Sequence, residues 1–204
     1  MDLKGASDER ILPATDNRLP TKSYAMKIKK TKFAGAYILE PKVFEDERGW
    51  FCETYRKDEL EKIGFRANFI QDNHSKSSGK GTLRGLHIQK NPHSQAKLIR
   101  CTRGAVLDVI VDLRKKSKTY KKWQKIELSE KNKRQVLIPR GFAHGYLTLL
   151  ANSEIEYKVD NYYDKDSERS IRFDDPRLKI NWGIKKPVLS QKDKTAPNLK
   201  DCDL

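Results

Sequence analysis

Short runs in which apolar and polar residues alternate recur along this sequence, and they limit the fold more than any other feature. The clearest is AVLDVIVDL at 105–113: its odd-numbered positions from 107 onward are apolar, whereas its even-numbered positions mix valine and isoleucine with Asp108 and Asp112. A period of two is typical of a β-strand, because successive side chains point to opposite faces of the sheet. Other strand-like runs, with turn residues between them, are 37–39, 42–44, 50–55, 97–101, 123–128, 136–138 and 155–159. The pattern predicts an all-β sandwich or barrel whose strands begin after Phe33.

One segment departs from the strand pattern and predicts a short helix at residues 57–64. Its acidic residues come early, Lys62 comes late, and Gly64 marks the stop, an order that suits the helix dipole. Residues 1–25 show neither period, and we interpret them as a basic, irregular N-terminal arm. The remaining residues, 26–204, are numerous enough to bury a core and are predicted to form one domain.

The chain is strongly basic, since 43 Lys and Arg residues against 28 Asp and Glu give a net charge of +15. This balance favours an anionic partner (nucleic acid, a membrane surface or a phosphorylated small molecule), and a lysine-rich solvated surface accounts for it equally well. The lysines are spread along the chain instead of forming one stripe, so we do not expect nucleic acid as the partner. No apolar run is long enough to cross a bilayer and the N-terminus lacks a signal pattern, so we expect a cytoplasmic protein without membrane contact.

His87 is the candidate for proton transfer. It lies in the motif LRGLH between two cationic residues, Arg84 and Lys97, which would favour an anionic substrate or a developing enolate. A histidine has an ordinary pKa of about 6.5, which suits a general base near neutral pH. Tyr157 or Tyr163, on another predicted strand, is a candidate acid. From these residues alone, the interpretation of His87 as a hydrogen-bonded core residue without a catalytic role is favoured over the catalytic one.

Patterns for other chemistries are missing from the sequence. The stretch 71–97 holds three of the four histidines, but Gln89 follows His87 at the spacing where a second metal-binding histidine would stand, and His144 is isolated. A metal site needs three or four converging ligands, so we do not expect one. There is no Gly-x-Ser-x-Gly elbow, phosphate loop or dinucleotide-binding glycine pattern. The three cysteines are widely spaced and are interpreted as reduced thiols.

Several motifs occur in an order that resembles one known family. They are QDNHS at 71–75, LRGLH at 83–87, QAK at 95–97, VIVDLR at 109–114, IPRGFAHG at 138–145 and LSQKD at 189–193. Together they resemble the dTDP-4-dehydrorhamnose 3,5-epimerase family, and the resemblance extends over about 26–193. Each motif alone is weak, whereas the ordered set is specific.

The resemblance implies a fold and a reaction. The expected fold is a cupin-like jelly roll, a double-sheet β-barrel with a few short helices, which usually forms a homodimer and needs no metal or organic cofactor. The expected substrate is a nucleotide-linked 4-keto-6-deoxyhexose, carried by dTDP, and the expected reaction is inversion at carbons 3 and 5. Relatives that invert carbon 3 alone share the same residues, so a C3-only epimerase remains an alternative. A sugar-nucleotide-binding protein without catalytic activity is the second alternative.

By resemblance, four residues carry the chemistry. His87 would remove a proton beside the ketone, and Asp193 would orient and charge-stabilise its imidazole. Lys97 would face the oxygen at carbon 4, where the enolate charge develops. Tyr157 would return a proton on the opposite face of the sugar. These side chains are far apart in sequence, but a barrel brings strand interiors together.

The resemblance also implies a set of substrate-binding residues and no metal ligands. Arginine suits a diphosphate because its planar group offers a fork of donors, and Phe51 and Tyr163 would provide aromatic walls for the base or sugar. Glu168 and Asp72 are each open to a second interpretation as surface ion pairs. The complete set is Arg48, Phe51, Glu53, Gln71, Asp72, Asn73, Arg84, His144, Tyr163 and Glu168.

Overall fold

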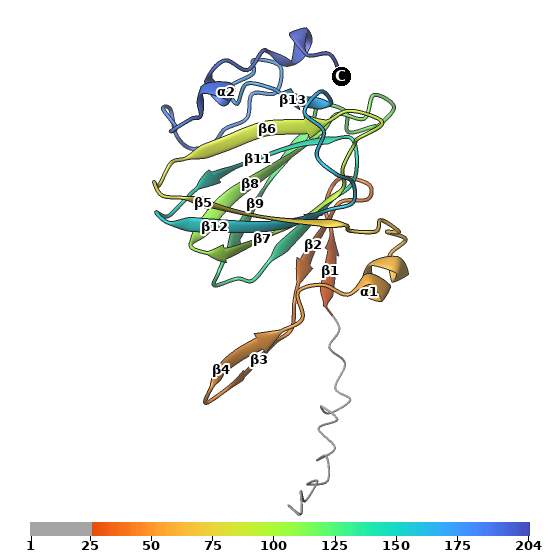
Figure 1. The fold of residues 1–204 in the computed structure, drawn as a ribbon, viewed down its shortest axis with the longest axis vertical. Helices are drawn as coiled ribbons and strands as arrows, with labels where there is room; N and C mark the ends of the chain where they lie inside the picture. The colour runs from red at the N-terminus through yellow and green to blue at the C-terminus, as the bar shows by residue number, and fades with distance from the viewer. Residues whose placement is uncertain (1–25) are drawn as a thin grey trace, which may run out of the picture.

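The computed structural model describes residues 26–204, and the arm predicted for residues 1–25 lies outside them. Two antiparallel sheets enclose the core, and a separate hairpin projects from the body of the molecule (Figure 1). The prediction of an all-β protein is therefore confirmed. Within the described residues, no helix has the length and apolar character needed to cross a bilayer.

The first sheet has six strands in the order β1-β2-β10-β7-β12-β5, so β5 forms one of its edges. Every neighbouring pair in it is antiparallel. Its strands are β1 (Lys27–Lys30), β2 (Tyr37–Glu40), β10 (Gln135–Ile138), β7 (Lys97–Arg103), β12 (Ser153–Val159) and β5 (Gln71–Ser77). The prediction that strands begin after Phe33 was wrong, because β1 precedes it. Three of the four residues of β1 are lysines, so its sequence lacks apolar alternation.

The second sheet has five strands in the order β13-β6-β11-β8-β9. They are β13 (Glu168–Ser170), β6 (Leu83–Gln89), β11 (Phe142–Thr148), β8 (Ala105–Asp112) and β9 (Trp123–Ser129). Strands β6 and β11 approach closely, since a Cβ added to Gly85 would lie 2.6 Å from the Cα of Gly145. This contact lies next to His87 and His144, which are register partners on the two strands.

The two faces of the five-stranded sheet contact different cores. On β8, Val106 and Ile110 pack between the sheets, whereas Val109 and Val111 pack beneath the C-terminal part of the chain. That part runs over the outer face of the sheet in Figure 1 and contributes apolar residues such as Trp182. The even-numbered face of 105–113, which carries both aspartates, therefore points into the barrel.

Three short helices complete the described fold. Helix α1 (Lys57–Lys62) lies where the sequence predicted one, and its Leu60 packs with Leu39, Leu98 and Leu137 on the outside of the six-stranded sheet. Helix α2 (Gln191–Lys194) and the 3-10 helix η1 (Leu199–Asp201) lie in the C-terminal part. Helix α2 is one turn long, which is too short for a periodic sequence signal.

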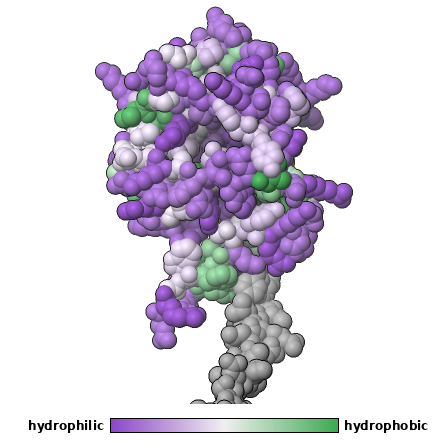
Figure 2. All heavy atoms as spheres, in the orientation of Figure 1, coloured by the Kyte–Doolittle hydropathy of each residue, from purple (hydrophilic) through white to green (hydrophobic). Residues whose placement is uncertain are grey.

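The hairpin of β3 (Val43–Asp46) and β4 (Gly49–Cys52) extends away from both sheets (Figure 1). Trp50 and Phe51 on β4 are 58% and 55% exposed. The surface is mostly hydrophilic, and an apolar patch stands out in the region of this hairpin (Figure 2). A projecting hairpin with exposed aromatic side chains is a typical interaction surface.

Candidate active site

A cavity of about 160 Å³ opens between the sheets, and strands β5, β6, β7 and β12 all contribute side chains to it. Inward-pointing positions alternate with outward-pointing ones on each strand, so residues distant in sequence meet there. Seven of the predicted residues line it: Gln71, Asn73, His87, Lys97, Tyr157, Tyr163 and Glu168. Three of the four predicted catalytic residues therefore share one cavity, and the fourth, Asp193, contacts His87.

His87 and Asp193 form a short, oriented pair. The Nε2 atom of His87 lies 2.7 Å from Oδ1 of Asp193, whose side chain is 3% exposed. Burial alone would raise the pKa of Asp193, but hydrogen bonds from His87 and Ser190 and the charge of His87 hold it below its ordinary value. An ionised carboxylate only accepts hydrogen bonds, so neutral His87 carries its proton on Nε2 and keeps Nδ1 free to accept one.

Ser190 fixes the other side of Asp193. It is the N-cap of α2: its Oγ donates to Oδ2 of Asp193 at 2.8 Å and accepts the backbone N–H of Asp193 at 3.1 Å. Serine is a preferred N-cap for this reason. The motif containing Ser190 was part of the resemblance, but the sequence interpretation gave this residue no role.

Lys97 begins β7 and lies deep in the site, with part of its surface accessible in the cavity. Burial lowers the pKa of Lys97 to about 8, and Asp108 and Glu168 oppose that shift. At neutral pH the ammonium is therefore mostly protonated. A cation held in a partly desolvated cavity is well placed to stabilise an oxyanion.

Tyr157 lies on the inward face of β12. Burial raises the pKa of Tyr157 above its ordinary value, and neighbouring Tyr146 adds to this effect, while Arg84 opposes it. Tyr146 is itself bonded to Ser75 on β5, with 3.0 Å between the two hydroxyl oxygens. Tyr157 therefore stays protonated at neutral pH, as a proton donor must.

A second His–Asp pair lies inside the barrel beside the first. Nε2 of His144 is 2.7 Å from Oδ2 of Asp108, and Asp108 is fully buried. Burial lowers the pKa of His144 despite the opposing effect of Asp108, and the positive charges of Lys97 and His87 lower it further. Asp108 was not among the predicted site residues, although a carboxylate in a mostly apolar strand was a visible signal.

Glu168, on β13, gathers contacts at the rim of the cavity. It accepts hydrogen bonds from the hydroxyl of Tyr163 at 3.1 Å and from Nζ of Lys192 at 2.7 Å. Burial would raise the pKa of Glu168, but the hydrogen bond and charge of Lys192 keep it below the ordinary value. Lys192 is a second residue that the sequence interpretation missed, although it directly precedes Asp193.

Arg84 and Asp72 make contacts away from the His87–Asp193 pair. Arg84 reaches from β6 to β5, donating to Oγ of Ser77 at 3.1 Å and to the carbonyl of Lys76 at 3.0 Å. Asp72 pairs with Lys158 at 2.9 Å. Asp72 lines a different cavity, of about 320 Å³, on the other face of β12.

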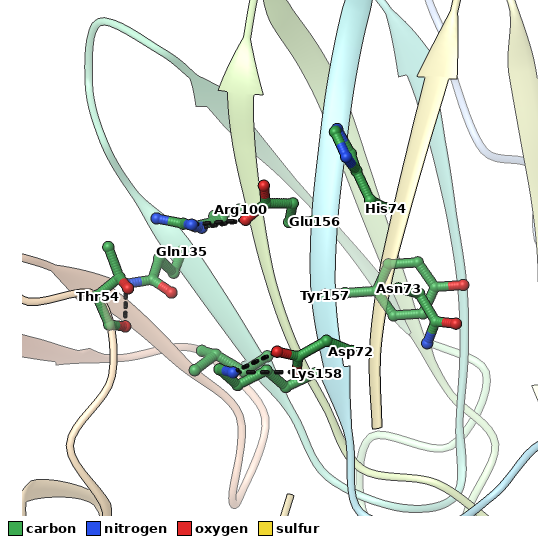
Figure 3. A pocket seen from close by; sticks show the side chains of 10 residues that line it. Thr54, Asp72, Asn73, His74, Arg100, Gln135, Glu156, Tyr157 and Lys158 are labelled. Carbon is green, nitrogen blue, oxygen red and sulfur yellow. Dashed lines mark hydrogen bonds and ion pairs between the residues drawn. The ribbon is translucent and has the colours of Figure 1, made fainter. Parts of the chain in front are cut away.

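This second cavity is drawn in Figure 3. Its charged side chains pair with each other, Arg100 with Glu156 at 2.5 Å and Lys158 with Asp72 (Figure 3). Tyr157 lies on the opposite side of β12 from these ion pairs. Within one chain, Asp72 shares this second cavity with Tyr157 but does not line the cavity that contains His87 and Lys97.

Arg48, Phe51 and Glu53 lie on or beside the projecting hairpin and do not line the cavity that contains His87. Arg48 is exposed and pairs with Asp46 at 2.6 Å, and Glu53 lies 3.9 Å from Arg56. A single chain does not bring these three predicted binding residues to the catalytic residues. Among residues 26–204, no three His, Cys, Asp or Glu side chains are grouped as ligands for a metal ion.

The two-sheet architecture is that of the cupin-like jelly rolls, and solved structures of sugar-nucleotide epimerases share it. Within that class the chain belongs to the dTDP-4-dehydrorhamnose 3,5-epimerase family, whose sequence profile matches residues 30–201. The resemblance inferred from the sequence is thereby confirmed, as is the cupin-like fold. The protein is an isomerase of the dTDP-sugar epimerase kind.

Three similar proteins illustrate the match. The dTDP-4-dehydrorhamnose 3,5-epimerase of Shigella flexneri is 47% identical, over 87% of this chain and 98% of its own. The structure of that enzyme from Bacillus anthracis, with TDP and PPi bound, has a TM-score of 0.84 and 49% identity, covering 86% of this chain and 100% of its own. An epimerase from Legionella pneumophila in complex with dTDP-4-keto-L-rhamnose has a TM-score of 0.83 and 43% identity, covering 88% and 95%.

Proposed function

We propose that this protein inverts carbons 3 and 5 of a dTDP-linked 4-keto-6-deoxyhexose by proton transfer between its own side chains and the sugar. The observation that carries the proposal is the single cavity that joins the His87–Asp193 pair to Lys97 and Tyr157. A base, an oxyanion partner and an acid are the three groups that such an inversion needs.

The chemistry follows from the acidity of carbons beside a ketone. His87 accepts the proton, and the electron pair of the broken C–H bond moves into the ring, leaving negative charge on the C4 oxygen. Lys97 stabilises that charge. Tyr157 then donates its proton to the same carbon from the other face, which inverts the centre. Solvent takes the proton from His87 and returns one to the Tyr157 phenolate, and the second carbon then repeats the sequence. Asp193 stabilises the imidazolium that forms on His87.

The walls of the cavity suit a sugar linked to a nucleotide. Gln71 and Asn73 offer amide donors and acceptors from β5, and Tyr163 provides an aromatic surface beside Glu168 at the rim. Lys192 and Arg84 add positive charge for a diphosphate. The substrate-binding roles given to these residues and to His144 are part of the proposal.

The projecting hairpin supports a homodimer. Arg48, Phe51 and Glu53 were expected to bind substrate, and in one chain they extend away from the cavity. We infer that a second copy receives this hairpin at its own site. Light scattering on the purified protein should give twice the mass of one chain, and a monomer of full activity would contradict the inference.

Solvent deuterium exchange tests the reaction directly. In D₂O, dTDP-4-keto-6-deoxyglucose should gain deuterium at carbons 3 and 5, observed by proton NMR as loss of both signals. Exchange and inversion at carbon 3 alone would establish the C3-only alternative. Tight binding in calorimetry without exchange at either carbon would establish the non-catalytic binder.

Tyr157→Phe tests the acid. Because the phenol acts after proton removal, this variant should retain exchange better than inversion, by about tenfold or more. Tyr163→Phe is the matched control, since it removes the other phenol that lines the cavity. Equal loss of exchange and inversion in Tyr157→Phe would contradict the role of Tyr157.

A further inference from the structure

We propose that a lysine-rich surface on the outer side of the five-stranded sheet docks on a membrane that carries anionic lipid headgroups. This surface, called the basic face, consists of residues 114–125, which lead from β8 into β9, and residues 177–188, which precede α2. The proposal does not depend on the proposed reaction. It departs from the expectation of no membrane contact.

Both segments of the basic face carry positive charge and no negative charge. No Asp or Glu occurs between Asp112 and Glu127, a stretch that holds seven Lys and Arg residues. None occurs between Asp175 and Asp193 either, a stretch that holds five. Neither segment is therefore neutralised from within, and each attracts anions.

The fold places the two segments side by side. The indole Nε1 of Trp123 donates to the carbonyl oxygen of Leu178 at 2.7 Å, and Nζ of Lys125 donates to that of Asn181 at 2.8 Å. Trp123 and Leu178 also pack in one apolar cluster on the side of the sheet that the C-terminal part covers (Figure 1). Lysines that are spread along the sequence thus gather on one surface of the folded chain.

The lysines of the basic face reach solvent without acidic partners. Within residues 26–204, no Asp or Glu forms an ion pair with any of them. Lys115 and Lys125 donate to backbone oxygens. The other exposed lysines are Lys116, Lys118, Lys122, Lys179, Lys185 and Lys186. Their ammonium charges remain available to an external partner.

The first segment is held in a fixed shape by the buried carboxylate of Asp112. This carboxylate accepts from Nε of Arg114 at 2.9 Å and from the hydroxyls of Ser117 and Thr119 at 2.6 Å each. A loop that is already ordered loses less conformational entropy when it docks. The exposed lysines between these anchors are therefore presented to a surface at little further cost.

Two features favour a lipid surface over a nucleic acid. First, Ile184 and Val188 flank Lys185 and Lys186, and these two aliphatic residues are 37% and 60% exposed. Aliphatic side chains beside lysines can enter the boundary between headgroups and acyl chains while the ammonium groups contact the headgroups.

Second, the basic face lacks the side chains that nucleic acids favour. Nucleic-acid-binding surfaces use arginine forks for phosphates and exposed aromatic rings for stacking on bases. Apart from Arg177, the fully exposed cations of the basic face are lysines. Its aromatic residues, Tyr120 and Trp123, are half-buried against the apolar cluster outside the sheet.

Vesicle flotation of the full chain tests the proposal. The vesicles contain equal parts of phosphatidylcholine and phosphatidylglycerol, and vesicles of phosphatidylcholine alone are the uncharged comparison. The protein should float with the anionic vesicles at low salt and be released in about 1 M NaCl, where the Debye length falls to roughly 3 Å. Absence of binding, or equal binding to both kinds of vesicle, would overturn the proposal.

Paired substitutions locate the contact. The double variant Lys185→Gln/Lys186→Gln should lower the partition coefficient by about tenfold or more, since each lysine near an anionic surface contributes about fivefold. The matched control is Lys57→Gln/Lys62→Gln on α1, which changes the net charge equally but lies outside the other sheet. It should change the partition coefficient by about twofold at most.

Melting temperatures establish that both variants fold, and Lys116→Gln/Lys118→Gln replaces the first variant if it does not. Equal losses in the basic-face variant and the control would show that net charge alone drives binding, which would overturn the proposal. Tighter binding to single-stranded RNA of mixed sequence than to anionic vesicles, at equal phosphate concentration, would also overturn it. None of these lysines lines the cavity that contains His87, so failure of the proposed reaction leaves the test intact.

Discussion

The two His–Asp pairs have the same geometry and different surroundings. In each, Nε2 lies 2.7 Å from a carboxylate oxygen. The side chain of His87 is 27% exposed and opens on the cavity, whereas that of His144 is 11% exposed. Asp193 comes from a helix outside the barrel, and Asp108 comes from the strand beside His144.

This difference teaches that the distance within a His–Asp pair does not define its role. Its role is defined by whether a substrate can reach the imidazole and by the charge of the neighbouring groups. The imidazole of His87 reaches the cavity, which is what the proposed proton transfer to and from a bound sugar requires. The imidazole of His144 is held neutral by desolvation, so it contributes shape and hydrogen bonding.

The largest effect should come from substituting each of the two histidines separately. His87→Asn should lower exchange at both carbons by about a thousandfold, since it removes the general base. His144→Asn should cost about tenfold, mainly in KM, because an amide retains part of the hydrogen bonding. NMR exchange rates and steady-state kinetics measure both. Equal losses of activity in the two variants would contradict the different roles given to the two His–Asp pairs.

A smaller effect is expected from substituting Asp193, the carboxylate partner of His87. Asp193→Asn should lower kcat by about a hundredfold, because the amide no longer stabilises the imidazolium and can favour the wrong tautomer. Ser190→Ala, which removes the contact to Oδ2 of Asp193, should lower kcat by about tenfold at most. A larger loss in Ser190→Ala than in Asp193→Asn would show that the cap, not the charge, matters.

The remaining predictions concern stability. Asp108→Ala should lower the free energy of unfolding by about 3 kcal/mol at pH 7, because it leaves a buried N–H of His144 unbonded. Asp193→Ala should cost about 1 kcal/mol. The pKa of Asp193 is depressed in the folded protein, so its stabilisation is complete above about pH 4 and is lost as pH falls through the folded-state value.

Urea unfolding at pH 7 and pH 3 measures these differences. The gap between Asp193→Ala and the unaltered protein should narrow at the lower pH. A gap that widens on acidification would mean that the carboxylate is not held ionised by His87.

Local alternation predicted two of the four strands that line the cavity, β7 and β12, but not β5 or β6, whose sequences are too polar or too rich in glycine and histidine to alternate clearly. The period of two at 105–113 correctly separated two faces of β8, although it did not show that both would be buried. The order of motifs then placed His87, Lys97 and Tyr157 in one family pattern, and the structure places them in one cavity.

Other parts of the site were beyond local patterns. Lys192 lies near Glu168 because α2 folds back over β6, a contact that no spacing encodes. The hydrogen bond between Asp108 and His144 depends on β8 and β11 being neighbours in the sheet, although they are far apart in the sequence. The hairpin residues were expected at the substrate, but their sequence does not say that they would extend away from their own cavity.

Asp193 follows every strand of the barrel along the chain, and this order has a consequence for synthesis. All the strands of the barrel leave the ribosome before this carboxylate does, so the cavity is able to form while its base still lacks a partner. The carboxylate of Asp193 can therefore bond to the imidazole of His87 only after α2 has been made.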